Sequence, residues 1–307
     1  MLYVHVPDQA ERWLALFRAA LPDIAVAGEA DAVDDGQVEF VACWRPPEGL
    51  FARFPRLRAV FALGAGVDRL LGRPDLAPGV ALIRLTDAGM ARQMAEYVLH
   101  GLLRFQRRFD DYARQQQAGL WQPLPQRDAS ELRVTVLGLG AIGGQVARTL
   151  ALLGYPVAGW SRSPREIDGV RCLHGSEALD GLLAETDALA MILPNTAETR
   201  GLIDARRLGL LPAGALVINA GRGEQLDLEA LLDGLDGGRL GGAQLDVFET
   251  EPLPAGHRAW RQPHLHITPH VAAMTLPAPS AQQVAAALRA FVAGRPVAGM
   301  VDRVRAY

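Results

Sequence analysis

The segment VTVLGLGAIGGQVARTL, residues 134–150, constrains the fold of this chain more than any other stretch. An apolar run, Val134–Leu137, leads directly into Gly138, Gly140 and Gly143, which open a helix-forming sequence. In this spacing the first glycine permits a tight turn, the second lets a ligand approach the backbone, and the third lets helix and strand pack closely. The helix N-terminus then attracts an anion. The segment therefore predicts the pyrophosphate-binding turn of a dinucleotide-binding domain.

Strand and helix signals alternate on both sides of this turn. Before it we expect strands at residues 2–6, 40–44, 59–62 and 81–85, a helix at 9–21, and one long helix from residue 91 to about residue 119. After it we expect strands at 134–137, 156–160, 188–193, 216–219, 242–245 and 266–268, and helices at 143–153, 176–185, 226–234 and 278–293. This alternation predicts an α/β protein with two Rossmann-like domains, each built on a doubly wound parallel sheet.

Composition excludes several classes of chemistry. The chain has 31 basic residues, and a scan of the sequence finds no lysine among them. A Schiff-base lysine, a pyridoxal-phosphate lysine and a P-loop lysine are therefore excluded. The net charge of −3 gives no general attraction to nucleic acid or anionic lipid, and no apolar stretch is long enough for a membrane span. With no signal peptide and two unrelated cysteines, Cys43 and Cys172, we expect a cytoplasmic protein with reduced thiols.

The end of the second strand of the dinucleotide domain indicates which cofactor is preferred. An NAD site places a carboxylate there to bind the ribose hydroxyls. This chain instead has Trp160, Ser161, Arg162 and Ser163, with Arg165 close behind. Guanidinium and hydroxyl groups would bind a 2′-phosphate, whereas a carboxylate would repel it. We therefore expect NADP(H) to be preferred, with NAD(H) possible but weaker. The alternative is that these arginines belong to a solvated loop.

Three later segments fall where strands of the same sheet should end. They are VINAGRGEQLD with Arg222, LDVFETEPLP with Asp246 and Glu251, and HITPHVAAMT with His270. Ligands bind at this edge of a doubly wound sheet. Taken singly, each has an ordinary explanation: a surface arginine, a solvated glutamate, or a buried structural histidine.

Together, and downstream of the glycine turn, these segments resemble the D-isomer-specific 2-hydroxyacid dehydrogenase family over essentially the whole chain. The segments that carry the resemblance are FALGAGVD (61–68), MARQMAEYVL (90–99), FDDYARQQQ (109–117), WQPLP (121–125), WSRSP (160–164), LPNTAETRGLI (193–203), NAGRGE (219–224), LDVFETEPLP (245–254) and ITPHVAA (267–273). Gly221 departs mildly from the pattern, because alanine is common before the arginine. The resemblance implies reduction of glyoxylate to glycolate and of hydroxypyruvate to D-glycerate with NADPH.

The resemblance also implies roles for individual residues. Arg222 corresponds to the arginine that holds the substrate carboxylate and carbonyl, His270 to the proton donor, and Glu251 to the acid that pairs with the histidine. Asp246 corresponds to the residue that faces the nicotinamide carboxamide. Expected cofactor contacts are Gly138, Gly140, Ala141, Ile142, Gly143, Ser161, Arg162, Ser163, Leu193, Pro194, Thr199, Ala220, Gly221, Asp246 and Ala272. Expected substrate contacts are Trp44, Leu63, Gly64, Ala65 and Gly66, with Arg45 adding charge and Gln93 and Met94 bordering the nicotinamide.

The chemistry of these residue types agrees with the implied roles. Hydride transfer to a ketone leaves an alkoxide that must gain a proton, and an imidazole beside a carboxylate is a suitable donor near neutral pH. An arginine offers a planar pair of donors to a 2-oxo acid and polarises its carbonyl. No metal is required. Two alternatives stay open: a reductase for a bulkier 2-oxo acid, and a dinucleotide-sensing protein of the same fold without turnover.

Domain organisation follows from the same resemblance. We expect a discontinuous substrate domain, residues 1–95 and 276–307, and a dinucleotide-binding domain, residues 96–275. An arm at about residues 96–128, which includes WQPLP, is expected to form a homodimer in which Trp121 reaches the partner's pocket.

Overall fold

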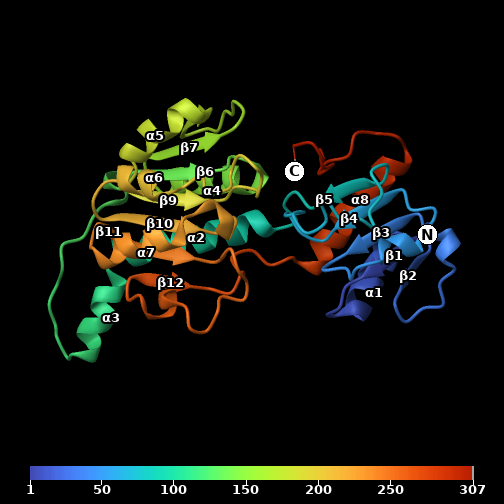
Figure 1. The fold of residues 1–307 in the computed structure, drawn as a ribbon, viewed down its shortest axis with the longest axis horizontal. Coiled ribbons are helices and arrows are strands. Elements are labelled where there is room, and N and C mark those ends of the chain that lie inside the picture. Colours follow the sequence, from blue (N-terminus) through green and yellow to red (C-terminus); the bar gives the residue numbers. More distant parts are fainter. Residues whose placement is uncertain (306–307) are drawn as a thin grey trace. The chain divides into compact units, whose positions relative to one another are not determined.

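The computed structural model describes residues 1–305 and divides into two compact units (Figure 1). Unit 1 consists of Met1–Met90 and Thr275–Tyr307, of which residues 306 and 307 lie outside the description, and unit 2 is Ala91–Met274. The discontinuity of the first unit agrees with the predicted fold. The expected boundaries, after residue 95 and before residue 276, lie slightly beyond this division.

Unit 1 is built on a five-stranded sheet in the order β2-β1-β3-β4-β5, and each pair of neighbours is parallel. The strands are β1 (Leu2–His5), β2 (Val26–Gly28), β3 (Phe40–Cys43), β4 (Ala59–Ala62) and β5 (Ala81–Arg84). The helices are α1 (Ala10–Ala20) and α8 (Pro277–Val292). Helix α1 forms because Trp13, Leu14 and Phe17 recur at helical spacing and are buried on one face.

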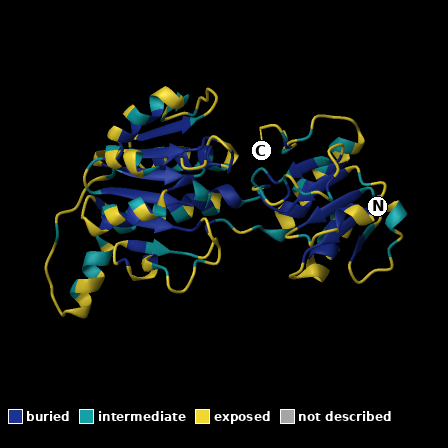
Figure 2. Cartoon of the chain, viewed as in Figure 1, coloured by how far each residue is buried: buried dark blue, intermediate teal, exposed yellow. Residues whose placement is uncertain are grey.

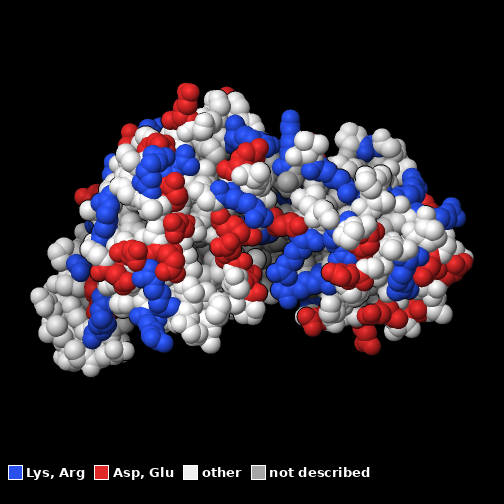
Figure 3. Space-filling model, in the orientation of Figure 1, with Lys and Arg blue, Asp and Glu red and all other residues white. Residues whose placement is uncertain are grey.

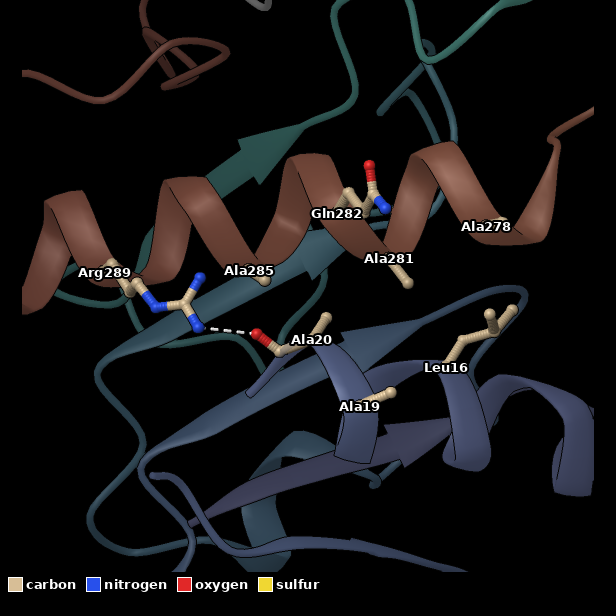
Figure 4. A pocket seen from close by; sticks show the side chains of 8 residues that line it. All are labelled: Leu16, Ala19, Ala20, Ala278, Ala281, Gln282, Ala285 and Arg289. Carbon is tan, nitrogen blue, oxygen red and sulfur yellow. Dashed lines mark hydrogen bonds between the residues drawn. The ribbon is translucent and has the colours of Figure 1, made fainter. Parts of the chain in front are cut away.

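Helices α1 and α8 lie side by side although they are distant in sequence. At one end of their contact Arg289 donates a 2.6 Å hydrogen bond to the Ala20 carbonyl (Figure 4). The small side chains between the helices leave an open groove of about 260 Å³. Its lining residues are Leu16, Ala19, Ala20, Ala278, Ala281, Gln282, Ala285 and Arg289.

Unit 2 is built on a seven-stranded parallel sheet in the order β12-β11-β10-β9-β6-β7-β8. Its strands are β6 (Val134–Leu137), β7 (Val157–Ser161), β8 (Val170–His174), β9 (Ala188–Met191), β10 (Ala215–Asn219), β11 (Leu240–Leu245) and β12 (Leu265–Ile267). Its helices are α2 (Met90–Gln106), α3 (Phe109–Gln117), α4 (Ala141–Leu152), α5 (Ser176–Ala184), α6 (Ala205–Leu210) and α7 (Leu228–Asp236). Strand order reverses between β6 and β9, so the carboxyl ends of these two strands form the switch point at which doubly wound sheets bind ligands.

Apolar side chains bury both faces of the central strands of the unit 2 sheet, β6, β7, β9, β10 and β11, which are almost entirely dark blue in Figure 2, while the edge strands β8 and β12 are partly exposed. One face packs against Leu179 of α5, Leu208 of α6 and Leu231 of α7. The other packs against Val98 of α2 and Val146 of α4. Continuous burial of the strands on both faces confirms the predicted doubly wound parallel arrangement.

The expected single helix from residue 91 to about 119 is wrong, because the segment forms α2 and α3 with a break between them. Arg108 adopts a left-handed backbone conformation (φ 56°), which ends the helical path. The break is stabilised by ion pairs from Arg104 to Asp110 and from Arg108 to Asp111. Helix α3 buries none of its side chains within the chain.

Candidate active site

The glycine turn after β6 packs so tightly that two of its glycines have no room for a side chain. Gly138 has φ 102°, and a Cβ on it would lie 2.5 Å from the Ile192 carbonyl oxygen. A Cβ on Gly143 would lie 1.8 Å from the Gly138 carbonyl oxygen. Gly140, which caps α4, differs because a Cβ there would meet nothing within 4 Å. The turn thus leaves open space in front of the N-terminus of α4, where Ala141 and Ile142 begin the helix.

The loop after β7 carries hydroxyl groups and one half-exposed guanidinium. Ser161 ends the strand and donates a 2.8 Å hydrogen bond to the Ser163 carbonyl. Arg162 Nη1 lies 3.8 Å from Glu198 Oε2, and the side chains are 40% and 70% exposed. A carboxylate of the loop after β9 therefore lies near Arg162, while β7 itself ends without an acidic residue.

The loop after β9 is folded on itself beside the glycine turn. Thr199 Oγ1 donates to the Pro194 carbonyl (2.7 Å) and accepts from the Thr196 N–H (2.9 Å). The Ile192 N–H donates to the Leu137 carbonyl, which fixes this loop against the end of β6. Leu193, Pro194 and Thr199 therefore lie at the carboxyl edge of the sheet, at the switch point.

The loop after β10 carries Arg222. Its backbone is held by the Asn219 side chain, which donates to the Arg222 carbonyl (2.9 Å) and accepts from the Gly221 N–H (3.0 Å). Arg222 Nη1 donates to the Gly221 carbonyl (2.7 Å). A Cβ on Gly223 would lie 1.9 Å from the Phe248 carbonyl carbon, so this loop and the loop after β11 are in direct contact.

Asp246 holds the loop that carries His270. It is buried, its Oδ1 accepts from Thr268 Oγ1 (2.6 Å) and the Val271 N–H (2.8 Å), and its Oδ2 accepts from the Ala272 N–H (2.8 Å). Its carbonyl accepts from the His270 N–H (2.8 Å). Both carboxylate oxygens of this residue, which was expected to face the nicotinamide carboxamide, are therefore engaged within the protein.

His270 and Glu251 form a hydrogen-bonded pair. Nδ1 of the imidazole lies 2.9 Å from Glu251 Oε2 and 3.1 Å from Oε1. The Phe248 N–H donates to Glu251 Oε1 (3.2 Å), which orients the carboxylate. His270 adopts a left-handed conformation (φ 58°), and its side chain is 47% exposed. A non-glycine residue in this conformation at a loop held so firmly is typical of a functional position.

Tyr97 and His266 extend the polar contacts behind this loop. The Tyr97 hydroxyl lies 2.8 Å from Thr268 Oγ1, and burial raises the pKa of Tyr97, so the hydroxyl stays protonated. His266 Nε2 lies 3.0 Å from Asp110 Oδ2, and desolvation lowers the pKa of His266. The Tyr97 contact connects α2 to the residue that follows β12, and the Asp110 contact connects α3 to β12 itself.

The substrate residues expected from the N-terminal half lie together in unit 1. Trp44 follows β3 and packs on Gly64, where an added Cβ would lie 2.7 Å from Trp44 Cζ3. The Leu63 carbonyl accepts from Thr275 Oγ1 (2.8 Å), and the Gly64 carbonyl accepts from the Leu85 N–H (3.0 Å). Arg45 has φ 49°, and its guanidinium lies 5.7 Å from the centre of the Trp44 ring.

Several contacts that hold these loops were not predicted from the sequence. Gln93 and Met274 exchange two hydrogen bonds within unit 2, and Gln225, Thr268 and Tyr97 bridge segments that are distant in sequence. Gln93 was expected to border the nicotinamide, whereas Tyr97, Gln225, Thr268 and Met274 lie inside the quoted segments without a predicted role. Their partners are distant in sequence, and local spacing does not encode such contacts.

Charge is mixed over the face of the molecule drawn in Figure 3, where arginines and carboxylates are interspersed. Within residues 1–305, no group of three or more histidine, cysteine or acidic side chains is arranged to hold a metal ion. None of the helices that the structure describes is long and apolar enough to cross a bilayer.

Comparison with known proteins places the chain among dehydrogenases. Residues 99–272 match a family model described as the NAD binding domain of D-isomer specific 2-hydroxyacid dehydrogenases. Glyoxylate/hydroxypyruvate reductase A of Serratia proteamaculans is 42% identical over 312 residues, which covers 100% of this chain and 99% of that protein.

Two solved structures resemble this chain over its whole length. A D-isomer specific 2-hydroxyacid dehydrogenase from Xanthobacter autotrophicus Py2, in complex with NADPH and MES, has a TM-score of 0.95 and 42% identity. An NADPH-dependent glyoxylate/hydroxypyruvate reductase from Sinorhizobium meliloti, in complex with NADP and sulfate, has a TM-score of 0.92 and 34% identity. Each comparison covers 100% of this chain and 99% of the other.

Proposed function

The chain belongs to the D-isomer specific 2-hydroxyacid dehydrogenase family, and we propose that it reduces small 2-oxo acids with NADPH, converting glyoxylate to glycolate and hydroxypyruvate to D-glycerate. The observation that carries the proposal is the hydrogen bond between His270 and Glu251. It lies in the same unit as the glycine turn and Arg222. A proton donor, an anion-binding arginine and a dinucleotide turn are the parts that this reaction needs.

The residues of unit 2 fit an NADP(H) dinucleotide. Gly138 and Gly143 allow the tight turn, and the space beside Gly140 admits a pyrophosphate at the N-terminus of α4. Ser161, Arg162 and Ser163 would bind the 2′-phosphate, because guanidinium and hydroxyl groups stabilise a charge that a carboxylate would repel. The relatives crystallised with NADPH or NADP support this preference over NAD(H). The remaining cofactor contacts that we propose are Ala141, Ile142, Leu193, Pro194, Thr199, Ala220, Gly221, Asp246 and Ala272.

When bound, NADPH supplies the hydride that adds to the carbonyl carbon of the substrate. We assign to Arg222 the binding of the substrate carboxylate and the polarisation of the carbonyl oxygen. Glu251 holds Nδ1 of His270, so Nε2 is the nitrogen that donates a proton to the forming alkoxide. Trp44 and the backbone N–H groups of Leu63, Gly64, Ala65 and Gly66 are the substrate contacts that we assign to unit 1.

The decisive experiment measures oxidation of NADPH and NADH by the purified protein with a panel of 2-oxo acids. We expect NADPH to be oxidised faster than NADH, and glyoxylate and hydroxypyruvate to be reduced with a higher kcat/KM than phenylpyruvate. A preference for phenylpyruvate would identify a reductase for bulkier acids. Tight NADPH binding without turnover of any acid would identify a dinucleotide sensor.

We further propose that the protein is a homodimer assembled through the arm at residues 96–128. Phe109, Leu120 and Trp121 of this arm are 53%, 51% and 98% exposed, which is unusual for large apolar side chains. Light scattering should give the mass of two chains, and a monomer would refute the proposal. Trp121→Ala should lower kcat/KM in the dimer if this side chain reaches the partner's pocket. A cytoplasmic location stays a prediction, which cell fractionation tests.

A further inference from the structure

Gln225 joins two loops that carry different parts of the proposed site. It is fully buried, and Nε2 donates to the Leu193 carbonyl (3.0 Å) and the Pro194 carbonyl (2.9 Å) of the loop after β9. Its Oε1 accepts from the Arg222 N–H (3.3 Å) of the loop after β10. Both donor hydrogens of the amide and its acceptor oxygen are therefore used across the two loops.

The backbone around Gln225 reinforces this connection. The Gly201 N–H donates to the Glu224 carbonyl (2.8 Å), and the Ile203 N–H donates to the Gln225 carbonyl (2.9 Å). Asn195 Nδ2 donates to Glu224 Oε1 (2.9 Å). The Gln225 side chain lies at the centre of these contacts, where water cannot replace the hydrogen bonds that it makes.

Gly221 gives Gln225 the space that it needs. A Cβ on Gly221 would lie 2.8 Å from Gln225 Oε1 and 3.0 Å from the backbone N and O of Leu193. Alanine at this position would therefore crowd the amide and the loop after β9 together. The position of the Gln225 amide therefore depends on glycine at position 221.

We propose that Gln225 is a positioning residue that couples the cofactor loop, residues 193–203, to Arg222, so that dinucleotide binding orders the guanidinium for the substrate carboxylate. The inference rests on the proposed function, because it takes Arg222 to be the substrate's carboxylate ligand. Leu193 and Pro194 are proposed cofactor contacts, and the hydrogen bonds of Gln225 end on their carbonyls and on the backbone of Arg222. Through these hydrogen bonds, a change in the order of the loop after β9 changes the order of the loop that carries Arg222.

The test compares Gln225→Met with the wild-type protein. Methionine is unbranched and of similar length, so it fills the space without making the three hydrogen bonds. We expect the KM for glyoxylate to rise about tenfold, with a smaller change in kcat. Saturating NADPH should tighten the binding of oxamate, an unreactive mimic of a 2-oxo acid, to the wild-type protein, and this enhancement should fall several-fold in the variant.

Gln262→Met is the matched control. Gln262 is also buried, and it also makes side-chain hydrogen bonds across elements, to Asp236 (2.6 Å) and from the His264 N–H (3.0 Å). It precedes β12, so it lies at the amino edge of the sheet rather than at the edge that carries the site. We expect its loss to lower the melting temperature while the KM and the effect of NADPH on oxamate binding stay at wild-type values.

Gln225→Glu separates positioning from a purely structural role. An ionised glutamate keeps an acceptor for the Arg222 N–H but cannot donate to Leu193 or Pro194. A protonated glutamate regains one donor. The KM ratio of Gln225→Glu to wild type should therefore fall toward one as the pH is lowered, whereas the ratio for Gln225→Met should not. This variant also keeps the proposal testable if Gln225→Met fails to fold.

The possible outcomes distinguish this inference from the proposed function. If the wild-type protein is active and neither Gln225 variant changes the KM or the response of oxamate binding to NADPH, the inference fails alone. If the wild-type protein turns over no 2-oxo acid, the proposed function fails. Amide hydrogen exchange then decides, because the inference requires residues 193–203 and 219–226 to exchange faster in Gln225→Met, and NADPH to protect 219–226 only in the wild type.

Discussion

His270 presents one ring nitrogen, Nδ1, to both oxygens of the Glu251 carboxylate, at 2.9 and 3.1 Å. An imidazole held in this way carries its hydrogen on Nδ1, because a carboxylate is only an acceptor. The other nitrogen is then the one that exchanges a proton with a substrate. Glu251 is itself oriented by the Phe248 N–H, so the ring orientation is set by the loop after β11.

His270→Ala should lower kcat about a hundredfold to ten-thousandfold while leaving the dissociation constant of NADPH nearly unchanged, since general acid catalysis contributes on that order. Glu251→Gln should cost less than His270→Ala, because an amide still orients the ring but no longer stabilises its positive charge. Steady-state kinetics and NADPH fluorescence titration measure both effects. Wild-type turnover in His270→Ala would remove this residue from the role of proton donor.

Two glycines of the turn should respond differently to the same substitution. Gly143→Ala places a Cβ 1.8 Å from the Gly138 carbonyl oxygen, so both the melting temperature and NADPH affinity should fall. A Cβ on Gly140 meets no protein atom within 4 Å, so Gly140→Ala should keep the melting temperature and weaken only NADPH. Calorimetry together with cofactor titration separates the two results. Unchanged NADPH binding in Gly140→Ala would mean that the pyrophosphate lies elsewhere.

Arg162 should determine the preference between the two dinucleotides. Arg162→Glu should weaken NADPH about tenfold or more and leave NADH nearly unaffected, because only NADPH carries the 2′-phosphate. Glu198→Gln should act in the opposite direction and by a smaller amount, since it removes a carboxylate 3.8 Å from Arg162 in an exposed pair. Dissociation constants for both dinucleotides test this, and an unchanged ratio in Arg162→Glu contradicts it.

The sequence was sufficient to predict the fold because the signals that define it are local. The glycine turn and the alternation of apolar strands with helices predicted both parallel sheets. Strand β8 was missed because its residues are half exposed at the sheet edge, and α6 was missed because it is only six residues long. The break at Arg108 was missed because no glycine or proline accompanies the left-handed residue.

For the site, the sequence indicated positions but could not give the contacts that hold them. Arg222, Glu251 and His270 were predicted because each follows a strand of the same sheet and lies in a segment that resembles the family. The bridge from Gln225 to Leu193 spans 32 positions, and that from Tyr97 to Thr268 spans 171. Hydrogen bonds between loops depend on how the folded segments meet, and no local period records that.

Thr268→Val should show that the Asp246 network positions His270. The substitution removes the hydroxyl that bonds Asp246 Oδ1 (2.6 Å) and Tyr97 (2.8 Å) but keeps the shape of the side chain. Because the same carboxylate holds the Val271 and Ala272 N–H groups, we expect kcat to fall several-fold and stability to fall by about 1 kcal/mol. The matched change Thr149→Val removes a half-buried hydroxyl of α4, whose side-chain contact with Gln145 is long (3.4 Å), and it should alter neither quantity. Loss of stability without loss of kcat would make the network structural only.

His266 should make the stability of the protein depend on pH. Desolvation lowers the pKa of His266 in the folded state, despite the nearby Asp110 carboxylate, and Arg104 and His100 act in the same direction as burial. The unfolded chain therefore takes up a proton at a higher pH than the folded chain, so the stabilising effect of the neutral ring is fully present above the ordinary histidine pKa of about 6.5. It is lost as the pH falls through that value toward the lower folded pKa.

His266→Gln keeps a donor for Asp110 but does not titrate, so the difference in melting temperature between wild type and this variant should shrink as the pH falls from about 8 to about 5.5. His264→Gln, at an exposed neighbouring histidine, serves as the control. If the difference in melting temperature between wild type and His266→Gln stays constant or grows on acidification, burial does not keep His266 neutral.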